Sequence, residues 1–210
     1  MNLTFTRQEL QDLFVAWLAL GLAFTLLLEP RLTDALLGTV GGVSVGVVIR
    51  TLVVSLLTVG VAFLLHELAH KVVAIRFGQV AAFKADYRML GFAIVGALVG
   101  FLFAAPGAVV HRGRITPKEN GLIALAGPVT NIGLAVVFLV PYLAFATSGV
   151  GGFLWDLASR GLQINLLLAG FNMIPFGPLD GRKVREWSTG VFLVVAVPSI
   201  LLGIGALFVL

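Results

Sequence analysis

Long runs of apolar residues, separated by short polar segments, dominate this sequence. Six such runs cover residues 13–28, 45–74, 89–110, 121–146, 161–175 and 187–210. A helix that crosses the hydrocarbon core of a bilayer needs about 20 apolar residues, and most of the runs are close to that length. The pattern therefore predicts an all-α polytopic membrane protein with about five to six transmembrane helices.

The third run, residues 89–110, is ambiguous because it is rich in glycine and interrupted by Pro106-Gly107. If this run crosses the membrane, eight Lys and Arg residues lie on one side and six on the other. If it enters and returns to the same side, only Arg31, Arg50 and Arg160 lie opposite the other eleven. Cytoplasmic loops carry the excess of Lys and Arg, so the second arrangement is favoured. The eleven are Arg7, Lys71, Arg76, Lys84, Arg88, Arg112, Arg114, Lys118, Arg182, Lys183 and Arg185.

We therefore expect five spans and one re-entrant hairpin, with the N-terminus in the cytoplasm. Composition agrees, since 59% of the 210 residues are hydrophobic and only 11% are charged, against about 25% charged in soluble domains. The length allows one domain, residues 1–210. Membrane topology explains the basic pI, and no basic cluster is interleaved with aromatic residues as in a nucleic-acid surface. Cysteine is absent, so any metal must be held by histidines and carboxylates.

The second run contains a compact group of ionisable residues, His66-Glu67-Leu68-Ala69-His70. Histidines four residues apart lie on one face of a helix and can bind one Zn²⁺ together. Glu67 is placed to accept a proton from water at the metal, so it fits a general base better than a ligand. His66 lies ten residues before Arg76, about 15 Å along a helix, which predicts a site within the bilayer near the cytoplasmic face.

A catalytic zinc usually has three protein ligands and one open position. Asp180 is the best third ligand, because Pro175 and Pro178 stop the fifth helix before it leaves the membrane. Gly177 and Gly181 allow a tight non-helical path, which at membrane depth is tolerated only around a buried or wet cavity. The acidic and histidine candidates outside the motif are Asp86, His111, Glu119, Asp156 and Asp180.

Three motifs together resemble the site-2 protease family of intramembrane zinc metalloproteases. They are His66–His70, the pair Asn172-x-x-Pro175 and Leu179-Asp180-Gly181, and the segment Ala126-Gly127-Pro128-Val129-Thr130-Asn131. The last is similar to the Gly-Pro-x-x-Asn segment of the family's central helix. The resemblance covers roughly residues 59–185, with the motifs in the expected order.

The resemblance implies a three-helix catalytic core that holds one zinc ion per chain. Asp180 would be the third ligand beside His66 and His70. Asn172 would face the site, either as a donor to the developing oxyanion or as a partner for the substrate backbone. Asn131 would tie helices together near the site.

The resemblance also implies a small β element on the cytoplasmic side, here residues 79–85 and 108–115, that can receive an extended substrate. Residues 89–105 look like an insertion between these strands. The catalytic core would span about residues 45–186, with peripheral helices at 13–28 and 187–210. Implied partners are the lipid bilayer and a transmembrane protein substrate, cut within or near its membrane segment; the sequence indicates no oligomeric state.

Several alternatives remain at this point. The histidine motif could arise by chance, Asp180 could pair with Arg182 in a turn, and Asn172 could hydrogen-bond between helices. A membrane zinc protease that trims prenylated proteins would use a glutamate ligand, but Glu119 and Glu186 lie outside convincing intramembrane helices. A divalent-metal transporter or non-cleaving scaffold is the other candidate, although Glu67 would be redundant in a pure binding site.

Overall fold

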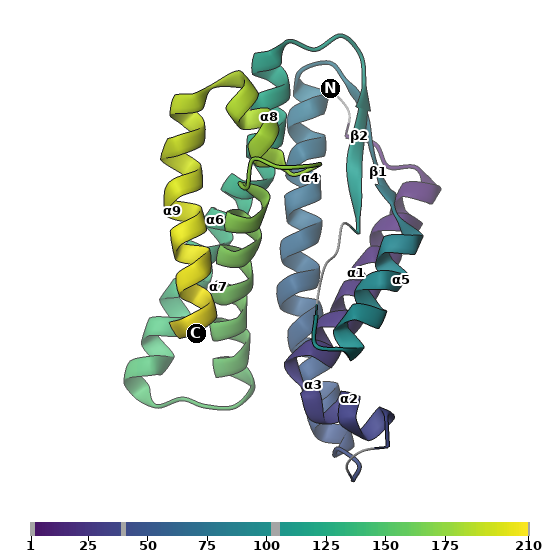
Figure 1. The fold of residues 1–210 in the computed structure, drawn as a ribbon, viewed down its shortest axis with the longest axis vertical. Helices are drawn as coiled ribbons and strands as arrows, with labels where there is room; N and C mark the ends of the chain where they lie inside the picture. The colour runs from purple at the N-terminus through teal and green to yellow at the C-terminus, as the bar shows by residue number, and fades with distance from the viewer. Residues whose placement is uncertain (1–2, 39–40, 102–105, 210) are drawn as a thin grey trace. The chain divides into compact units, whose positions relative to one another are not determined.

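The computed structural model describes residues 3–38, 41–101 and 106–209, and most of them are helical (Figure 1). The chain divides into two compact units. The first unit comprises Met1–Phe5, Ala62–Ala82 and Val109–Leu210, and the second comprises Thr6–Val61 and Phe83–Ala108.

In the first unit, α7 packs against both α6 and α9, and α8 packs against the same two helices (Figure 1). Small residues allow these close approaches, as in other helical membrane proteins. Gly161 of α7 lies against the ring of Phe138, and Gly170 lies against the backbone of Ser199. The helices of this unit are α4 (Val61–Arg76), α6 (Pro117–Ser148), α7 (Phe153–Asn172), α8 (Asp180–Trp187) and α9 (Thr189–Val209).

In the second unit, α1 packs against α3 and α5. A π-helical turn, Leu56–Gly60, links α3 to α4, so that residues 45–76 form one continuous helical segment. The indole of Trp17 donates a hydrogen bond to the Leu56 carbonyl (3.0 Å). Gly60 leaves room for that indole because it has no Cβ. The helices are α1 (Arg7–Leu28), α2 (Pro30–Leu36), α3 (Val45–Ser55) and α5 (Tyr87–Leu98).

The expected β element is a two-stranded antiparallel sheet of β1 (Val80–Ala85) and β2 (Gly107–Arg112). In the second unit, α1 covers part of the outer edge of β1. Glu9 accepts a hydrogen bond from the Phe83 N–H (3.0 Å), and Asp12 accepts one from the Ala85 N–H (3.2 Å).

These two contacts explain why α1 begins earlier than expected. The sequence predicted a helix from residue 13, with Asp12 as a polar boundary, whereas α1 begins at Arg7. Glu9 and Asp12 are buried because their carboxylates accept from strand backbone. The side chain of Thr6 caps the helix by accepting from the Glu9 N–H (3.1 Å).

The third apolar run leaves the sheet and returns to it. Its helical part, α5, has 12 residues, or about 18 Å, which is too short to cross the bilayer. The Asp86 N–H donates to the Pro106 carbonyl (3.0 Å), so the two ends of the segment meet. Part of the expected hairpin, residues 102–105, lies outside the described residues, and its entry into a membrane stays a prediction.

Among the described residues, four helical segments are long and apolar enough to cross a membrane: Arg7–Leu28, Val45–Arg76, Pro117–Ser148 and Thr189–Phe208. The fifth expected span, residues 161–175, falls in α7, which begins at Phe153 and ends at Asn172. α7 is not one of the four and carries Asp156 and Arg160 near its beginning. The number of spans beyond four stays a prediction.

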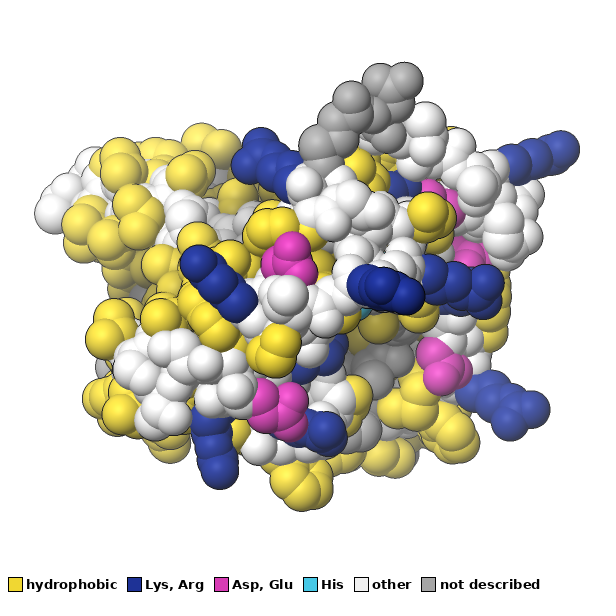
Figure 2. All heavy atoms as spheres, turned by 90° about the horizontal axis from the view of Figure 1, so that it is seen from above, with side chains coloured by type: hydrophobic (Ala, Val, Ile, Leu, Met, Phe, Trp, Pro, Cys, Tyr) yellow, Lys and Arg dark blue, Asp and Glu magenta, His cyan; other side chains and the backbone are white. Residues whose placement is uncertain are grey.

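The end of the first unit at which α4 finishes and α6 begins is rich in basic residues. Arg76 is the last residue of α4, and Lys118 lies in the first turn of α6. Figure 2 looks onto this end and shows many Lys and Arg side chains across it. α4 and α6 therefore each present a charged end beside a long apolar stretch.

Candidate metal centre

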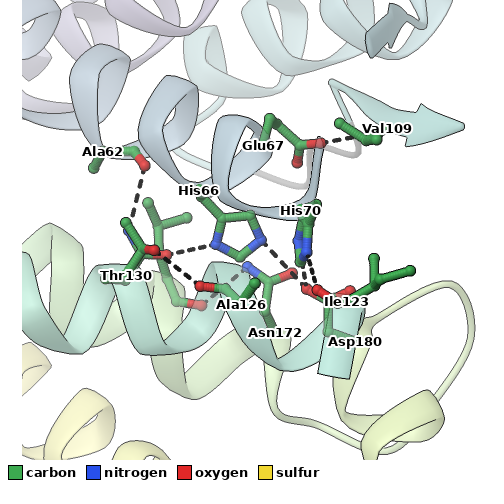
Figure 3. Close-up of polar contacts among 12 residues, drawn as sticks. Ala62, His66, Glu67, His70, Val109, Ile123, Ala126, Thr130, Asn172 and Asp180 are labelled. Carbon is green, nitrogen blue, oxygen red and sulfur yellow. Dashed lines mark hydrogen bonds and ion pairs between the residues drawn. The ribbon is translucent and has the colours of Figure 1, made fainter. Parts of the chain in front are cut away.

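The three expected metal ligands lie together in the first unit (Figure 3). His66 and His70 are one turn apart on α4, and Asp180 is the first residue of α8. The Asp180 Oδ2 atom lies 3.3 Å from Nε2 of His66 and 3.2 Å from Nε2 of His70. Their exposed fractions are only 4%, 7% and 8% in the order His66, His70, Asp180.

The loop after α7 carries Asp180 to the two imidazoles. Pro175 and Pro178 prevent the helix from continuing, and Gly177 adopts a left-handed conformation (φ 61°). Gly181 lies directly against the backbone of Met173, where a Cβ would clash. The helix therefore ends and the chain turns sharply, as the proline and glycine spacing predicted. A new helix begins at Asp180 and includes Gly181, which was expected in the non-helical path.

Hydrogen bonds orient both imidazoles with Nε2 toward Asp180. Nδ1 of His66 lies 2.6 Å from Oδ1 of Asn131, and Nδ1 of His70 lies 2.7 Å from the Ile123 carbonyl oxygen. Both partner atoms are acceptors, so each Nδ1 carries the proton and donates. Each Nε2 then presents a lone pair, the tautomer that a metal-binding histidine needs.

The residues at this centre fit a metal ion. The ligand atoms of His66, His70 and Asp180 lie within 4.8 Å of one another. A Cβ built on Gly127 would lie against Nε2 of both histidines, in the space a metal would fill, since Zn–N bonds are about 2.0–2.1 Å. Two imidazoles and a carboxylate are the donor set of many catalytic zinc sites.

Glu67 is buried beside the centre but lies outside the group of three ligands. Its Oε2 atom accepts a hydrogen bond from the backbone N–H of Val109 in β2 (3.0 Å). The strand therefore holds the one carboxylate on α4 that the sequence analysis assigned to proton transfer. Figure 3 shows this contact on the side of α4 away from Asn172.

Asn172 is half-buried at the end of α7, and Figure 3 draws its amide on the side of the two imidazoles. The amide Nδ2 donates to the Leu168 carbonyl of its own helix (3.0 Å). Asn131 of α6 is fully buried, and its Nδ2 donates to the Ala62 carbonyl of α4 (3.3 Å). It thus contacts a candidate ligand directly and also ties α6 to α4.

Two participants were missed by sequence reasoning. Asn165 of α7 is fully buried, and its Oδ1 accepts from Nδ2 of Asn131 (3.0 Å). Its signal was an amide side chain in an apolar run, which is costly in a membrane helix and therefore informative. The Val109 N–H is a backbone group and left no signal in the sequence.

The two glutamates considered as alternative ligands act elsewhere. Glu119 completes a capping box, because its carboxylate accepts from the Thr116 N–H (2.8 Å) at the start of α6. Glu186 accepts from Arg182 (2.9 Å), and both side chains are largely exposed. These contacts give each glutamate a role away from the centre.

Comparison with known proteins identifies several relatives named as zinc metalloproteases. MJ0611 of Methanocaldococcus jannaschii is 38% identical over 199 residues, which cover 93% of each chain. YwhC of Bacillus subtilis is 36% identical over 145 residues, 62% of this chain and 66% of that protein. MJ0392 of M. jannaschii is 30% identical over 127 residues, 59% of this chain and 31% of that protein.

No protein-family profile and no solved structure matches the chain. The assignment therefore rests on the relatives and on the centre itself. The similarity to MJ0611 extends over 93% of each chain, and zinc is the metal that the relatives' names specify. The chain belongs to the site-2 protease family of zinc metalloproteases.

Proposed function

We propose that this protein is an intramembrane protease that hydrolyses peptide bonds within or near transmembrane segments of other membrane proteins. One observation carries the proposal: the buried cluster of His66, His70 and Asp180, two of whose members lie on a helical segment long enough to span a bilayer. Ionisable groups in such a segment are costly and are generally functional.

His66, His70 and Asp180 would hold one zinc ion. When bound there, zinc supplies a Lewis acid that lowers the pKa of a coordinated water and polarises the scissile carbonyl. The chain's own part is to bring two neutral imidazoles and one carboxylate together. The Nδ1 hydrogen bonds of His66 and His70 hold the rings in place for this.

Glu67 would act as the general base and then the general acid. Its carboxylate accepts a proton from the attacking water and later delivers that proton to the leaving amine nitrogen. The Val109 N–H binds one carboxylate oxygen, Oε2, and would keep the group from rotating. Oε1 would then exchange the proton.

Asn172 would contact the substrate, as a donor either to the developing oxyanion or to the peptide backbone. In the structure its Nδ2 is bonded to the Leu168 carbonyl. That carbonyl belongs to the same helix, so substrate could compete for the amide through a change of rotamer. Donors of this kind stabilise the transition state when they point at the new charge.

An extended substrate segment would add to the outer edge of β2. Strand addition satisfies the substrate's backbone groups by pairing. On β1, the outward N–H groups of Phe83 and Ala85 are already bonded to carboxylates. On β2, the Val109 N–H is bonded to Glu67, so a substrate would pair with backbone groups of β2 on either side of Val109 and would lie beside the catalytic residues.

We propose further that the protein is a single-domain, multi-pass protein of the cell membrane, with its active site near the cytoplasmic side. The basic residues at the end of α4 and the beginning of α6 support this orientation, because cytoplasmic loops carry the excess of Lys and Arg. His66 would lie about 15 Å from that end of α4. Water would reach the centre from the same side.

The alternative of a metal transporter or non-cleaving scaffold is less well supported. Glu67 lies outside the ligand group yet is buried beside it. A site that only binds metal gains nothing from an additional buried carboxylate, whose desolvation is costly. A hydrolytic site requires one.

The test compares wild type with Glu67→Gln in liposomes that contain a single-span reporter substrate. We expect the variant to keep its zinc and to lose cleavage, because Gln cannot accept the proton. Glu186→Gln, which changes an exposed glutamate, is the matched control and should cleave normally. Cleavage by Glu67→Gln at the wild-type rate would refute the role of Glu67, and no cleavage by zinc-loaded wild type of any membrane substrate would refute the proposal.

A further inference from the structure

A chain of hydrogen bonds connects Nδ1 of His66 to the interior of α7. It lies on the side of the imidazole opposite Nε2, the atom that would bind the metal. It begins at the Gly161 carbonyl, which accepts from Nδ2 of Asn165 (2.8 Å). Oδ1 of Asn165 accepts from Nδ2 of Asn131 (3.0 Å), and Oδ1 of Asn131 accepts from Nδ1 of His66 (2.6 Å). Both asparagines have no exposed surface.

The first member of this chain determines the orientation of all the others. A backbone carbonyl can only accept, so Asn165 must turn its NH₂ group to Gly161 and its oxygen to Asn131. Asn131 must then offer N–H to Asn165, and its second N–H reaches the Ala62 carbonyl (3.3 Å). Its oxygen is left for His66, whose Nδ1 must carry the proton.

The two histidines differ in the group that keeps the proton on Nδ1. Nδ1 of His70 meets the Ile123 carbonyl, which cannot exchange donor for acceptor. Nδ1 of His66 meets an amide, and an amide that turns by about 180° presents NH₂ in place of oxygen. His66 therefore needs a further group that prevents Asn131 from turning.

We propose that Asn165 is the positioning residue that sets the tautomer of His66 and thereby its affinity for zinc. The inference rests on the proposed role of His66 as a zinc ligand. Without Asn165, only the longer hydrogen bond to the Ala62 carbonyl (3.3 Å) orients Asn131, so its NH₂ can turn to Nδ1, which moves the imidazole proton to Nε2. An Nε2–H group cannot bind a metal.

The test is the zinc dissociation constant of the purified protein, measured by competition with a chelator. Asn165→Leu should raise this constant about tenfold, the lower end of the effect of partners behind a metal ligand. Asn165→Asp should restore affinity to near wild type, because a buried carboxyl is protonated and can accept from Asn131 while donating to Gly161. In an Asn131→Ala background, Asn165→Leu should cause no further loss.

Gln163→Leu is the matched control, because Gln163 lies on the same helix and donates to the Ala206 carbonyl of α9 (2.9 Å). It removes an interhelical amide contact without touching His66, and should leave the zinc constant unchanged. Equal losses in Asn165→Leu and Gln163→Leu would overturn the inference, as would an unchanged constant in Asn165→Leu. Equal losses in Asn165→Asp and Asn165→Leu would also overturn it.

A second measurement does not depend on any variant folding. Nitrogen-15 NMR of histidine in zinc-free wild type should show the His66 proton on Nδ1, and a proton found on Nε2 would overturn the inference. Wild type that binds no zinc would overturn the proposed metal centre. If wild type binds zinc tightly and Asn165→Leu has the same zinc dissociation constant, only the role of Asn165 is overturned.

Discussion

At the scale of single residues, the space for a metal ion beside His66 and His70 depends on Gly127 of α6, which has no side chain. Gly127 faces Nε2 of both His66 and His70, and a Cβ there would occupy the space between them. We expect Gly127→Ala to lose its zinc, from about one ion per chain in wild type to a small fraction of that. Zinc analysis of the purified protein measures this directly.

The control for this prediction is Gly133→Ala on the same helix, where a Cβ meets nothing within 4 Å. Both changes replace glycine in a helix, which by itself favours the helix by about 1 kcal/mol. Comparison of the two variants therefore separates an effect on the space for the metal ion from an effect on helix stability. Equal zinc content in the two variants would show that Gly127 does not keep space for the ion.

Residue chemistry was predictable where it depends on local spacing. The separation of His66 and His70 placed both on one helix face, and the prolines and glycines around Asp180 predicted its return to them. The tasks of Asn165 and of the Val109 N–H were not predictable, because they depend on which helices and strands become neighbours. A single sequence does not show which helices and strands pack against one another.

At the scale of elements, α1 stabilises β1 through a buried carboxylate. Asp12 accepts from the Ala85 N–H and from the hydroxyl of Tyr87 (2.7 Å). Asp12→Ala leaves these donors without their acceptor, and we expect a loss of about 1–3 kcal/mol of stability. Thermal unfolding in detergent measures it.

Glu186→Ala provides the comparison, because it removes an exposed ion pair with Arg182 that is worth only about 0.5 kcal/mol. A similar, small shift of the melting temperature in both variants would argue against a structural role for Asp12. The helix boundary at residue 13 was mispredicted for the same reason. A charged residue was taken as an exposed end, whereas a strand distant in sequence satisfies it.

The strand β2 should matter to catalysis through its backbone. Val109→Pro removes the N–H that binds Glu67 at a strand edge, where proline is tolerated. A hydrogen bond to a charged group is worth about 1.5–3 kcal/mol, so cleavage should fall by about tenfold or more while zinc content stays the same. Val109→Ala keeps the N–H and should cleave normally; full activity in Val109→Pro would contradict the assigned contact.

At the scale of the whole molecule, the long apolar helices and the distribution of basic residues predict how the protein is oriented in the membrane. The natural chain has no cysteine, so single cysteines can be labelled without background. α6 has 32 residues, about 48 Å, and its two ends should lie on opposite sides of the membrane. We expect Lys118→Cys to react from the cytoplasmic side and Ser148→Cys from the outside.

The reverse pattern would invert the proposed topology, and labelling of both positions from one side would show that α6 does not cross. The apolar runs predicted that such helices exist, because their length and composition are properties of the sequence. They did not predict their ends, as α7 shows by beginning at Phe153. The expected run began after Arg160, although the helix includes both Arg160 and Asp156.

The account as a whole depends on one zinc ion held by His66, His70 and Asp180. Zinc-edge X-ray absorption of the purified protein, as wild type and as Asp180→Ala, tests this most directly. We predict about one zinc per chain in wild type, with imidazole scattering and only nitrogen or oxygen neighbours at about 2.0–2.2 Å, and little zinc in Asp180→Ala. Wild type without zinc, a spectrum without imidazole, or full zinc content in Asp180→Ala would contradict the account.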